Sequence, residues 1–304
     1  MSKEKTAKSS RAILTVSLLL FIALLTAPAF AFQEAPGTRP KTPVIEPGGS
    51  VTVEPGALQS FQTSAEGADK FEWKLQGKGS LSDSNSRAVL YTAPGEGGTL
   101  AILTVVARNR AGESSSAPVT IRVRTRAAYS LDALAIPAGW MSGKKDHPDT
   151  YIHLNAGSDC HQGSQCQQFA YTTGGGWGGI YWWPLDCGSS GTDDAWKSFR
   201  TGACAIDLKH ATGMDEVRSL SFWARGAHGG EVIEFRVGGP DILPKPGHST
   251  GRITLSSAWE HHVIDLAGLD LSHSAGLFLW TATDLANSGG AVFFLDNVQF
   301  EGFK

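Results

Sequence analysis

The residues best suited to hold a small molecule lie in the stretch Gly174–Pro184, which reads GGGWGGIYWWP. Its aromatic side chains offer large, stiff surfaces for stacking, and its glycines allow a partner to approach the backbone closely. The aromatic end of the stretch predicts a β-strand, because β-favouring residues follow a glycine run. Alternation then places Tyr181 and Trp183 on one face, free for a ligand, and Ile180 and Trp182 on the other face, in a core.

A second candidate is the charged pair Glu234 and Arg236, which alternates with the apolar residues Ile233, Phe235 and Val237. The two charges therefore share one strand face and can pair while they hydrogen-bond hydroxyl groups. A flat apolar ring beside a few fixed polar groups is the mixture that a sugar-binding surface needs. The alternative is an exposed salt bridge that contributes little stability.

Two further tryptophans are candidates for the same surface. Trp280 shares a strand face with Phe278 and would extend an aromatic platform, and Trp177 would close over a ligand from its glycine-rich loop. The competing interpretation is that these rings fill the core, since aromatic side chains are usually well buried. The predicted ligand contacts are Trp177, Tyr181, Trp183, Glu234, Arg236 and Trp280.

The carboxylates form no clear catalytic pair. Glycoside cleavage needs two of them that face a sugar across a cleft. Glu231 and Glu234 are three residues apart, so on a strand they point to opposite faces, and Asp193 and Asp194 lie in a polar loop. No catalytic residue is predicted, and binding is favoured over catalysis. Two alternatives remain: a glycan-active enzyme or its accessory subunit, and a purely structural adhesion protein.

Residues 1–31 have the pattern of an export signal. A basic leader precedes the apolar run 13–25 and the small-x-small sequence 29–31. The apolar run is short for a membrane span of about 20 residues, so no span is expected after leader cleavage. Residues 32–43 are rich in proline and polar side chains and predict a flexible linker. We expect a secreted or periplasmic protein of a bacterial envelope.

The charge of the chain argues against a nucleic-acid partner. The 304 residues include 26 Lys and Arg against 29 Asp and Glu, a formal net charge of −3. Cleavage after residue 31 removes four basic residues and one acidic residue, which leaves 22 against 28, a net charge of about −6. A nucleic-acid-binding domain typically carries a basic face instead.

All four cysteines, Cys160, Cys166, Cys187 and Cys204, follow residue 159. In an exported chain an even count predicts disulfides, and four cysteines allow three pairings. We favour Cys160 with Cys166 and Cys187 with Cys204, because neighbour pairing closes the shortest loops. The chain has no C-x-x-C, which disfavours zinc.

Residues 44–124 alternate in short segments that clusters of turn residues divide, a pattern typical of a small β-sandwich. Trp73 lies in mid-segment with Phe71 and Leu75 on its face, as in a sandwich core. The runs FEWKLQGKGSLS, LYTAPGEGG and LTVVARNRAG resemble bacterial immunoglobulin-like repeats, without the two cysteines of antibody domains. The resemblance implies an immunoglobulin-like spacer or adhesive module.

Residues 129–304 hold eight of the nine tryptophans and all nine histidines, so function is expected there. Alternating segments again predict strands, with a hairpin turn at 226–230 between the segments 219–225 and 231–237. No segment has a convincing long helical period. The prediction is an all-β chain, in which a sandwich precedes two sheets packed as a jelly roll.

Five runs of this region carry a family resemblance: IPAGWMSGKK, WGGIYWWP, SLSFWARGAHGGEVIEFRVGG, WEHHVIDLAGLDLS and FFLDNVQFE. They resemble bacterial carbohydrate-binding jelly-roll modules, whose fold is also called galactose-binding-like. The loop from Leu185 to Ala203 departs from that group. The resemblance implies a polysaccharide or glycoconjugate partner, or a cell-surface protein. It also implies a structural Ca²⁺ held by Asp296 in the closing strand and Asp132 near the start of the module.

Overall fold

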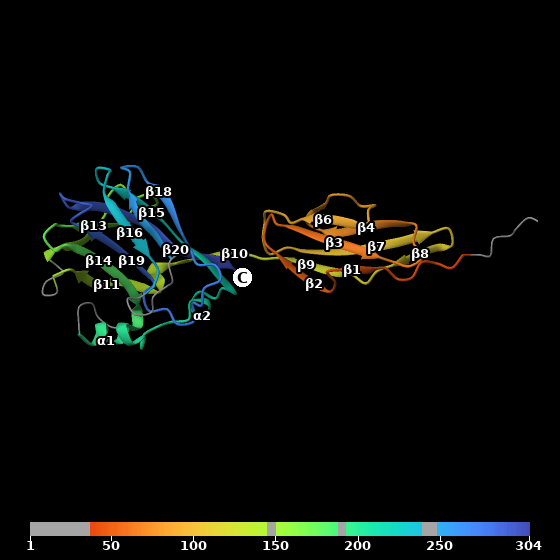
Figure 1. The fold of residues 1–304 in the computed structure, drawn as a ribbon, viewed down its shortest axis with the longest axis horizontal. Coiled ribbons are helices and arrows are strands. Elements are labelled where there is room, and N and C mark those ends of the chain that lie inside the picture. The colour runs from red at the N-terminus through yellow and green to blue at the C-terminus, as the bar shows by residue number, and fades with distance from the viewer. Residues whose placement is uncertain (1–36, 145–149, 188–192, 239–247) are drawn as a thin grey trace, which may run out of the picture.

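The computed structural model describes residues 37–144, 150–187, 193–238 and 248–304, which form two β-sandwiches in series (Figure 1). The all-β class predicted from the sequence is confirmed. The predicted export signal lies outside the described residues. Within those residues, no helix is long and apolar enough to cross a membrane.

The N-terminal sandwich has two mainly antiparallel sheets. The side chains of Trp73, Phe61 and Tyr91 are buried between them. The first sheet has the strand order β1 (Val44–Glu46), β3 (Leu58–Ser64), β6 (Ala88–Thr92) and β5 (Ser80–Leu81). The second has the order β2 (Ser50–Val53), β9 (Val119–Val123), β7 (Leu100–Asn109) and β4 (Lys70–Gly77), with β8 (Gly112–Ser115) beside β7. Its immunoglobulin-like character and the domain boundaries stay predictions.

Residues 37–43, expected to belong to a flexible linker, hydrogen-bond to the first sandwich instead. The carbonyl groups of Thr38 and Pro40 accept hydrogen bonds from Asn109 Nδ2 (2.8 Å) and Ser114 Oγ (2.6 Å). The backbone N–H of Lys41 donates to the carbonyl of Glu66 (3.0 Å). Pairing of these backbone groups holds the segment against the sandwich, so its proline content does not make it flexible.

The second sandwich has a sheet on each side of one core. The β20 sheet has the order β12 (Ile152–Ala156), β13 (Gln167–Tyr171), β20 (Ala291–Phe303), β15 (Glu216–Gly226) and β18 (Glu260–Asp265), with β10 (Arg126–Ser130) also paired to β20. The β14 sheet has the order β11 (Ala135–Ser142), β14 (Trp177–Pro184), β19 (Phe278–Thr283), β16 (Val232–Arg236) and β17 (Ser249–Thr254).

Aromatic rings fill the space between these two sheets. Phe169 from β13 lies with its ring centroid 5.4 Å from Trp182, 5.6 Å from Trp280 and 5.4 Å from Phe293. All four side chains are fully buried. Edge-to-face and offset contacts of this kind add to the stability that the rings contribute through their buried apolar area.

The predicted hairpin at 226–230 is wrong. Strand β15 belongs to the β20 sheet and β16 to the β14 sheet, so these residues cross from one sheet to the other. Glu231 turns inward at the crossing, where its carboxylate accepts the backbone N–H of His228 (2.9 Å) and occupies the place that a side chain on Gly226 would need. A glycine pair in an alternating pattern signals a turn, but not which sheet the next strand joins.

Short helices, which the sequence pattern did not predict, occur between β14 and β15. They are η3 (Leu185–Cys187), α1 (Asp193–Thr201) and α2 (Leu208–Thr212), and η1 (Leu131–Ala133) precedes β11. Helix α2 is capped by Asp207, whose carboxylate accepts the backbone N–H groups of Lys209 and His210, and it ends at Gly213 in the left-handed conformation. Helices α1 and α2 are too short to leave a clear helical period in the sequence.

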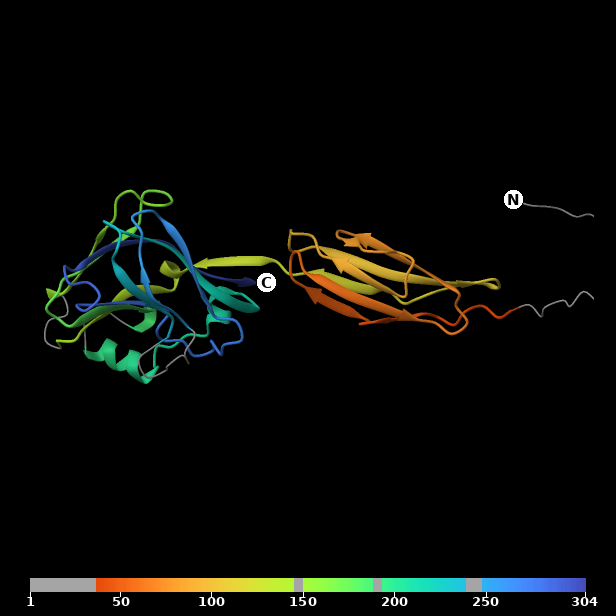
Figure 2. The same cartoon turned by 45° about the horizontal axis from the view of Figure 1, so that its top comes forward.

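The junction between the two sandwiches is the short segment 124–125, which joins β9 to β10 (Figure 2). Thr125 and Lys304 exchange two backbone hydrogen bonds of 3.1 and 2.8 Å. Glu216 pairs with Arg124 and with Arg218, whose Nε lies 2.6 Å from Glu216 Oε1. Arg218 also pairs with Glu54 of the first sandwich, so the four charges tie the two sandwiches together.

Loss of the Glu216 carboxylate is expected to loosen this junction. Hydrogen bonding by Arg124, helped by Arg218, lowers the pKa of Glu216 against the opposing effect of burial. A lowered carboxyl pKa means that the ion pairs persist above the usual pKa and are lost as the pH falls through the lowered value. Glu216→Gln should broaden the distance distribution between spin labels placed one in each sandwich. Glu113→Gln, which removes an exposed pair with Arg108, should leave the distribution unchanged.

Candidate functional site

The outer face of the β14 sheet carries one row of residues across all five strands. Strand register places Met141, Gly179, Thr281, Glu234 and Arg252 side by side, from β11 to β17. The middle of the row has small residues, because Gly179, which is buried, has no side chain and the half-buried Thr281 has a short one. The arginine end of the row is charged and exposed.

A small hollow opens on this face beside Glu234. Its lining comes from β16, β17, β19 and the turn after β19: Val232, Glu234, Arg252, Thr281, Ala282, Thr283 and Ala286. The hollow therefore combines threonine hydroxyl groups, one carboxylate and one guanidinium above an apolar base. Such a surface can hold a ligand that has both hydroxyl groups and apolar faces.

Glu234 and Arg236 pair as predicted. Arg236 Nε donates to Glu234 Oε1 over 2.5 Å, and Ser249 Oγ donates to the same oxygen over 2.7 Å. The Glu234 side chain is 17% exposed and that of Arg236 is 48% exposed. The carboxylate is thus held in one orientation, whereas the outer nitrogens of Arg236 remain available. Ile233 and Phe235 face the core, which confirms the predicted alternation.

Trp177 is the first residue of β14, rather than part of the glycine-rich loop as predicted, and it is 39% exposed, so its contact with a ligand stays a prediction. Asp284 fixes the glycine loop before it, because the Asp284 carboxylate accepts hydrogen bonds from the backbone N–H of Gly174 (3.1 Å), the backbone N–H of Gly176 (2.9 Å) and the hydroxyl of Tyr171. These bonds, that of Tyr171 first, lower the pKa of Asp284. The loop is ordered before any ligand arrives.

Tyr181 and Trp183 lie on the outer face, as alternation predicted, but they are not available to a ligand. Helix α1 covers both rings: Trp183 lies 5.2 Å from Trp196 and 5.6 Å from Phe199, and Tyr181 lies 4.9 Å from Phe199. Trp183 is fully buried and Tyr181 is 6% exposed. The prediction that they contact a ligand is wrong, because the loop thought to be polar folds into an amphipathic helix over them.

Trp280 is also unavailable. It lies on the inner face of β19, where it contacts Phe169 and Phe293 and is fully buried. The predicted ligand contact at Trp280 is wrong, because its alternation with Thr281 points the ring to the core. Of the six predicted contacts, Trp177, Glu234 and Arg236 remain accessible on the outer face.

Both predicted disulfides are confirmed. Cys187–Cys204 encloses α1 and holds it over β14, and Cys160–Cys166 closes the short loop after β12. No free cysteine occurs among the described residues.

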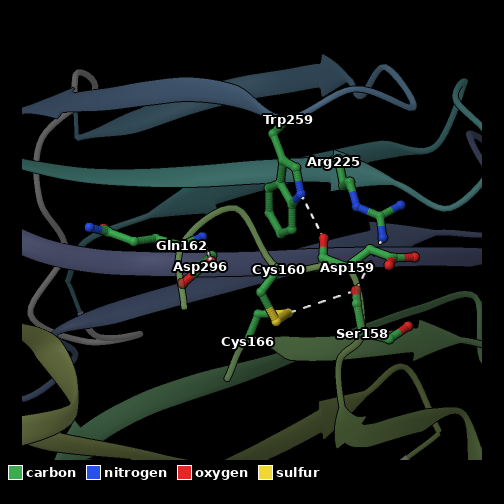
Figure 3. The surroundings of a disulfide bond; sticks show 8 residues. All are labelled: Ser158, Asp159, Cys160, Gln162, Cys166, Arg225, Trp259 and Asp296. Atoms are coloured by element: carbon green, nitrogen blue, oxygen red, sulfur yellow. Dashed lines mark hydrogen bonds between the residues drawn. A yellow bond between two sulfur atoms is a disulfide. The ribbon is translucent and has the colours of Figure 1, made fainter. Parts of the chain in front are cut away.

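The Cys160–Cys166 loop lies over the β20 sheet beside Trp259 and Arg225 (Figure 3). These two residues belong to a cluster of rings that the sequence pattern did not predict. The His161 ring stacks on Trp223 at 3.6 Å, and Trp259 Nε1 donates to the carbonyl of Asp159 over 2.9 Å. The Arg225 guanidinium lies over the rings of Phe294 and Trp259 and donates to the carbonyl of Ser158. Because the loop already occupies these groups, this face is less open to a ligand than the β14 sheet.

Asp132 and Asp296 line one polar pocket beside the middle of β20, between the residues that pair with β13 and those that pair with β10, together with Gln165, Gln167 and Asn297. Asp296 also accepts the backbone N–H of Gln162 (2.8 Å). Burial, then the charge of Asp296, raises the pKa of Asp132. These hard oxygen donors fit a calcium ion. Within the described residues no group of three or more His, Cys, Asp or Glu side chains could hold a metal, so further ligands would be amide or carbonyl oxygens.

The chain matches no known family profile and no curated protein. Solved structures that match part of this chain include the family 11 carbohydrate-binding module of the cellulosomal cellulase Lic26A-Cel5E of Clostridium thermocellum, with 13% identity over 58% of this chain and 93% of that one, and a TM-score of 0.35. A SusE-like protein has 10% identity over 83% of this chain and 95% of that one, with a TM-score of 0.27.

A third structure is the Bacteroides ovatus protein SGBP-B of a mixed-linkage glucan utilization locus, in complex with a mixed-linkage heptasaccharide. It has 10% identity over 80% of this chain and 71% of that one, with a TM-score of 0.16. All three TM-scores are below 0.5, so the geometry of the site has to carry the functional argument.

The two outer-face tryptophans are expected to respond differently to truncation. Trp183→Ala should lower the free energy of unfolding by about 3–5 kcal/mol, because it leaves a cavity under α1. Trp177→Ala should change it little, since that ring is partly solvent-exposed. Urea unfolding of both variants measures the difference. A small loss in Trp183→Ala would show that α1 does not depend on this ring, and an equally large loss in Trp177→Ala would show that Trp177 is also structural.

Proposed function

We propose that the protein binds a glycan without cleaving it, on the open part of the outer face of the β14 sheet. The observation that carries the proposal is the hollow beside Glu234, where threonine hydroxyl groups, one carboxylate and the guanidinium of Arg252 meet at one end of the row. A sugar ring is flat enough to lie over Thr281 and this hollow. Its hydroxyl groups would reach the threonine hydroxyls and the charged end.

The site offers both kinds of contact that a sugar needs. Trp177 supplies an exposed ring at one side, and Arg236, Ser249 and Thr281 supply hydrogen-bonding groups at the other. Fixed contacts to Asp284 and Glu234 order these groups in advance. Pre-ordering lowers the entropy cost of binding.

The carboxylates favour binding over cleavage. Glu234 is the one acidic residue among the described residues that line the hollow, and it is already paired with Arg236. Hydrolysis of a glycosidic bond generally uses two carboxylates, one on each side of the bond. A polysaccharide or surface glycoconjugate is the proposed partner, and the two disulfides suit an oxidising compartment such as the envelope or the exterior.

Trp177→Ala is expected to weaken glycan binding about tenfold or more, because stacking on an exposed ring is lost. Affinity electrophoresis and titration calorimetry against a polysaccharide panel measure the change. Val263→Ala is the matched control, since Val263 is an exposed apolar residue on the opposite sheet. Equal binding by wild type and Trp177→Ala would place the site elsewhere.

We also propose that Asp132 and Asp296 hold a structural Ca²⁺. Calcium should raise the Tm by several degrees, since a ligand at 100 times its Kd stabilises the native state by about 2.7 kcal/mol. Asp132→Asn should abolish the response, whereas Asp69→Asn in the first sandwich should keep it. Identical melting of the wild type in excess calcium and in excess chelator would contradict this proposal.

A further inference from the structure

We infer that the glycan bound at this face is acidic, and that Arg252 recognises its carboxylate or sulfate group. The inference rests on the proposed glycan-binding function and adds the chemical class of the ligand. It is drawn from the charges of the β14 sheet and from the partners that each charge already has.

Arg252 lines the hollow without a partner of its own. Over the described part of the chain it has neither an ion pair nor a side-chain hydrogen bond, and it is exposed. The arginines at the junction, Arg124 and Arg218, and Arg236 on the neighbouring strand are all ion-paired. A guanidinium that lines a hollow and has no partner among the described residues can use its donors for a ligand.

The nearest carboxylate does not neutralise Arg252. Glu234 lies opposite Arg252 in the β16–β17 register, yet its bonded oxygen already accepts from Arg236 and Ser249. Arg236 balances the Glu234 charge, so the extra charge of the hollow and its rim is the positive charge of Arg252. This local excess is opposite in sign to the formal net charge of the whole chain, −3. An anion that approaches the acidic protein therefore meets an attractive potential here.

The position of Arg252 suits a group on the edge of a sugar ring. Arg252 is on the edge strand β17, two strands from Thr281, which is roughly 10 Å along the row. A ring that lies over Thr281 would direct an acidic substituent along the row, past Glu234, toward the guanidinium. The planar guanidinium fork binds carboxylate and sulfate oxygens in pairs, which gives specificity as well as affinity.

The test compares acidic polymers with their neutral counterparts, using the full chain. Polygalacturonate and alginate are measured against their carboxyl-reduced forms, and chondroitin sulfate against its desulfated form, by titration calorimetry. The variants are Arg252→Gln, Arg252→Lys and, as a matched control, Arg122→Gln, which removes the same charge from an exposed position on β9.

We expect the wild type to bind at least one acidic polymer about tenfold or more tightly than its neutral form, since a charge-assisted hydrogen bond is lost in the neutral polymer. Arg252→Gln should remove most of that preference, Arg252→Lys should retain part of it, and Arg122→Gln should leave it unchanged. Added salt should weaken binding of the acidic polymer more than binding of the neutral one. The pair of polymers that shows the effect distinguishes carboxylate from sulfate.

Three results would overturn the inference. Equal binding of acidic and neutral polymers, weakened in both by Trp177→Ala, would leave glycan binding intact and remove the acidic preference. Equal losses in Arg252→Gln and Arg122→Gln would show a general effect of charge. Absence of binding to acidic and neutral polymers alike, by a protein with a cooperative melting transition, would refute the glycan-binding function as well.

Discussion

Strand β14 is buried on both faces from residue 178 to residue 184, and the organisation of the second sandwich follows from this condition. Its inner residues Ile180 and Trp182 fill the core against the β20 sheet, as any sandwich strand would. Its outer rings, Tyr181 and Trp183, would expose a large apolar surface without α1. A nine-residue helix is not stable alone, so packing on these rings and the Cys187–Cys204 bridge must hold it in place.

Cover at one end of the sheet leaves the other end to bind. Beyond Tyr181 the outer face of β14 has Gly179, and the same row continues through Thr281 on β19 and Glu234 on β16. The Glu234 carboxylate is fixed by Arg236 and Ser249. The arrangement separates two regions: the rings under α1 are buried, and the polar part of the face is the proposed recognition surface.

Alternation along single strands was sufficient to predict much of this structure. It assigned the inner and outer residues of β14 and β16 and the shared face of Glu234 and Arg236, and neighbour pairing of cysteines was also correct. Accessibility was not predictable in this way, because it depends on what packs above a face. Trp196 and Phe199 are three residues apart between two bridged cysteines, and this spacing was the available signal for α1. The contact of His161 with Trp223 depends on the fold, since 61 intervening residues hide it.

The junction determines how a mechanical load would pass through the molecule. A glycan held at the β14 sheet, opposed by an attachment on the side of the first sandwich, would put the chain under tension that enters the second sandwich at Arg126. Strand β10 would then be pulled along its own axis, antiparallel to the residues 299–303 of β20. All the hydrogen bonds of this pair are strained together in that geometry, as in a shear joint, rather than opened one after another as in a zipper. The Thr125–Lys304 bonds and the Arg124–Glu216 ion pair lie at the same point and share the force. The β10–β20 pair itself would therefore resist a pull between the two sandwiches.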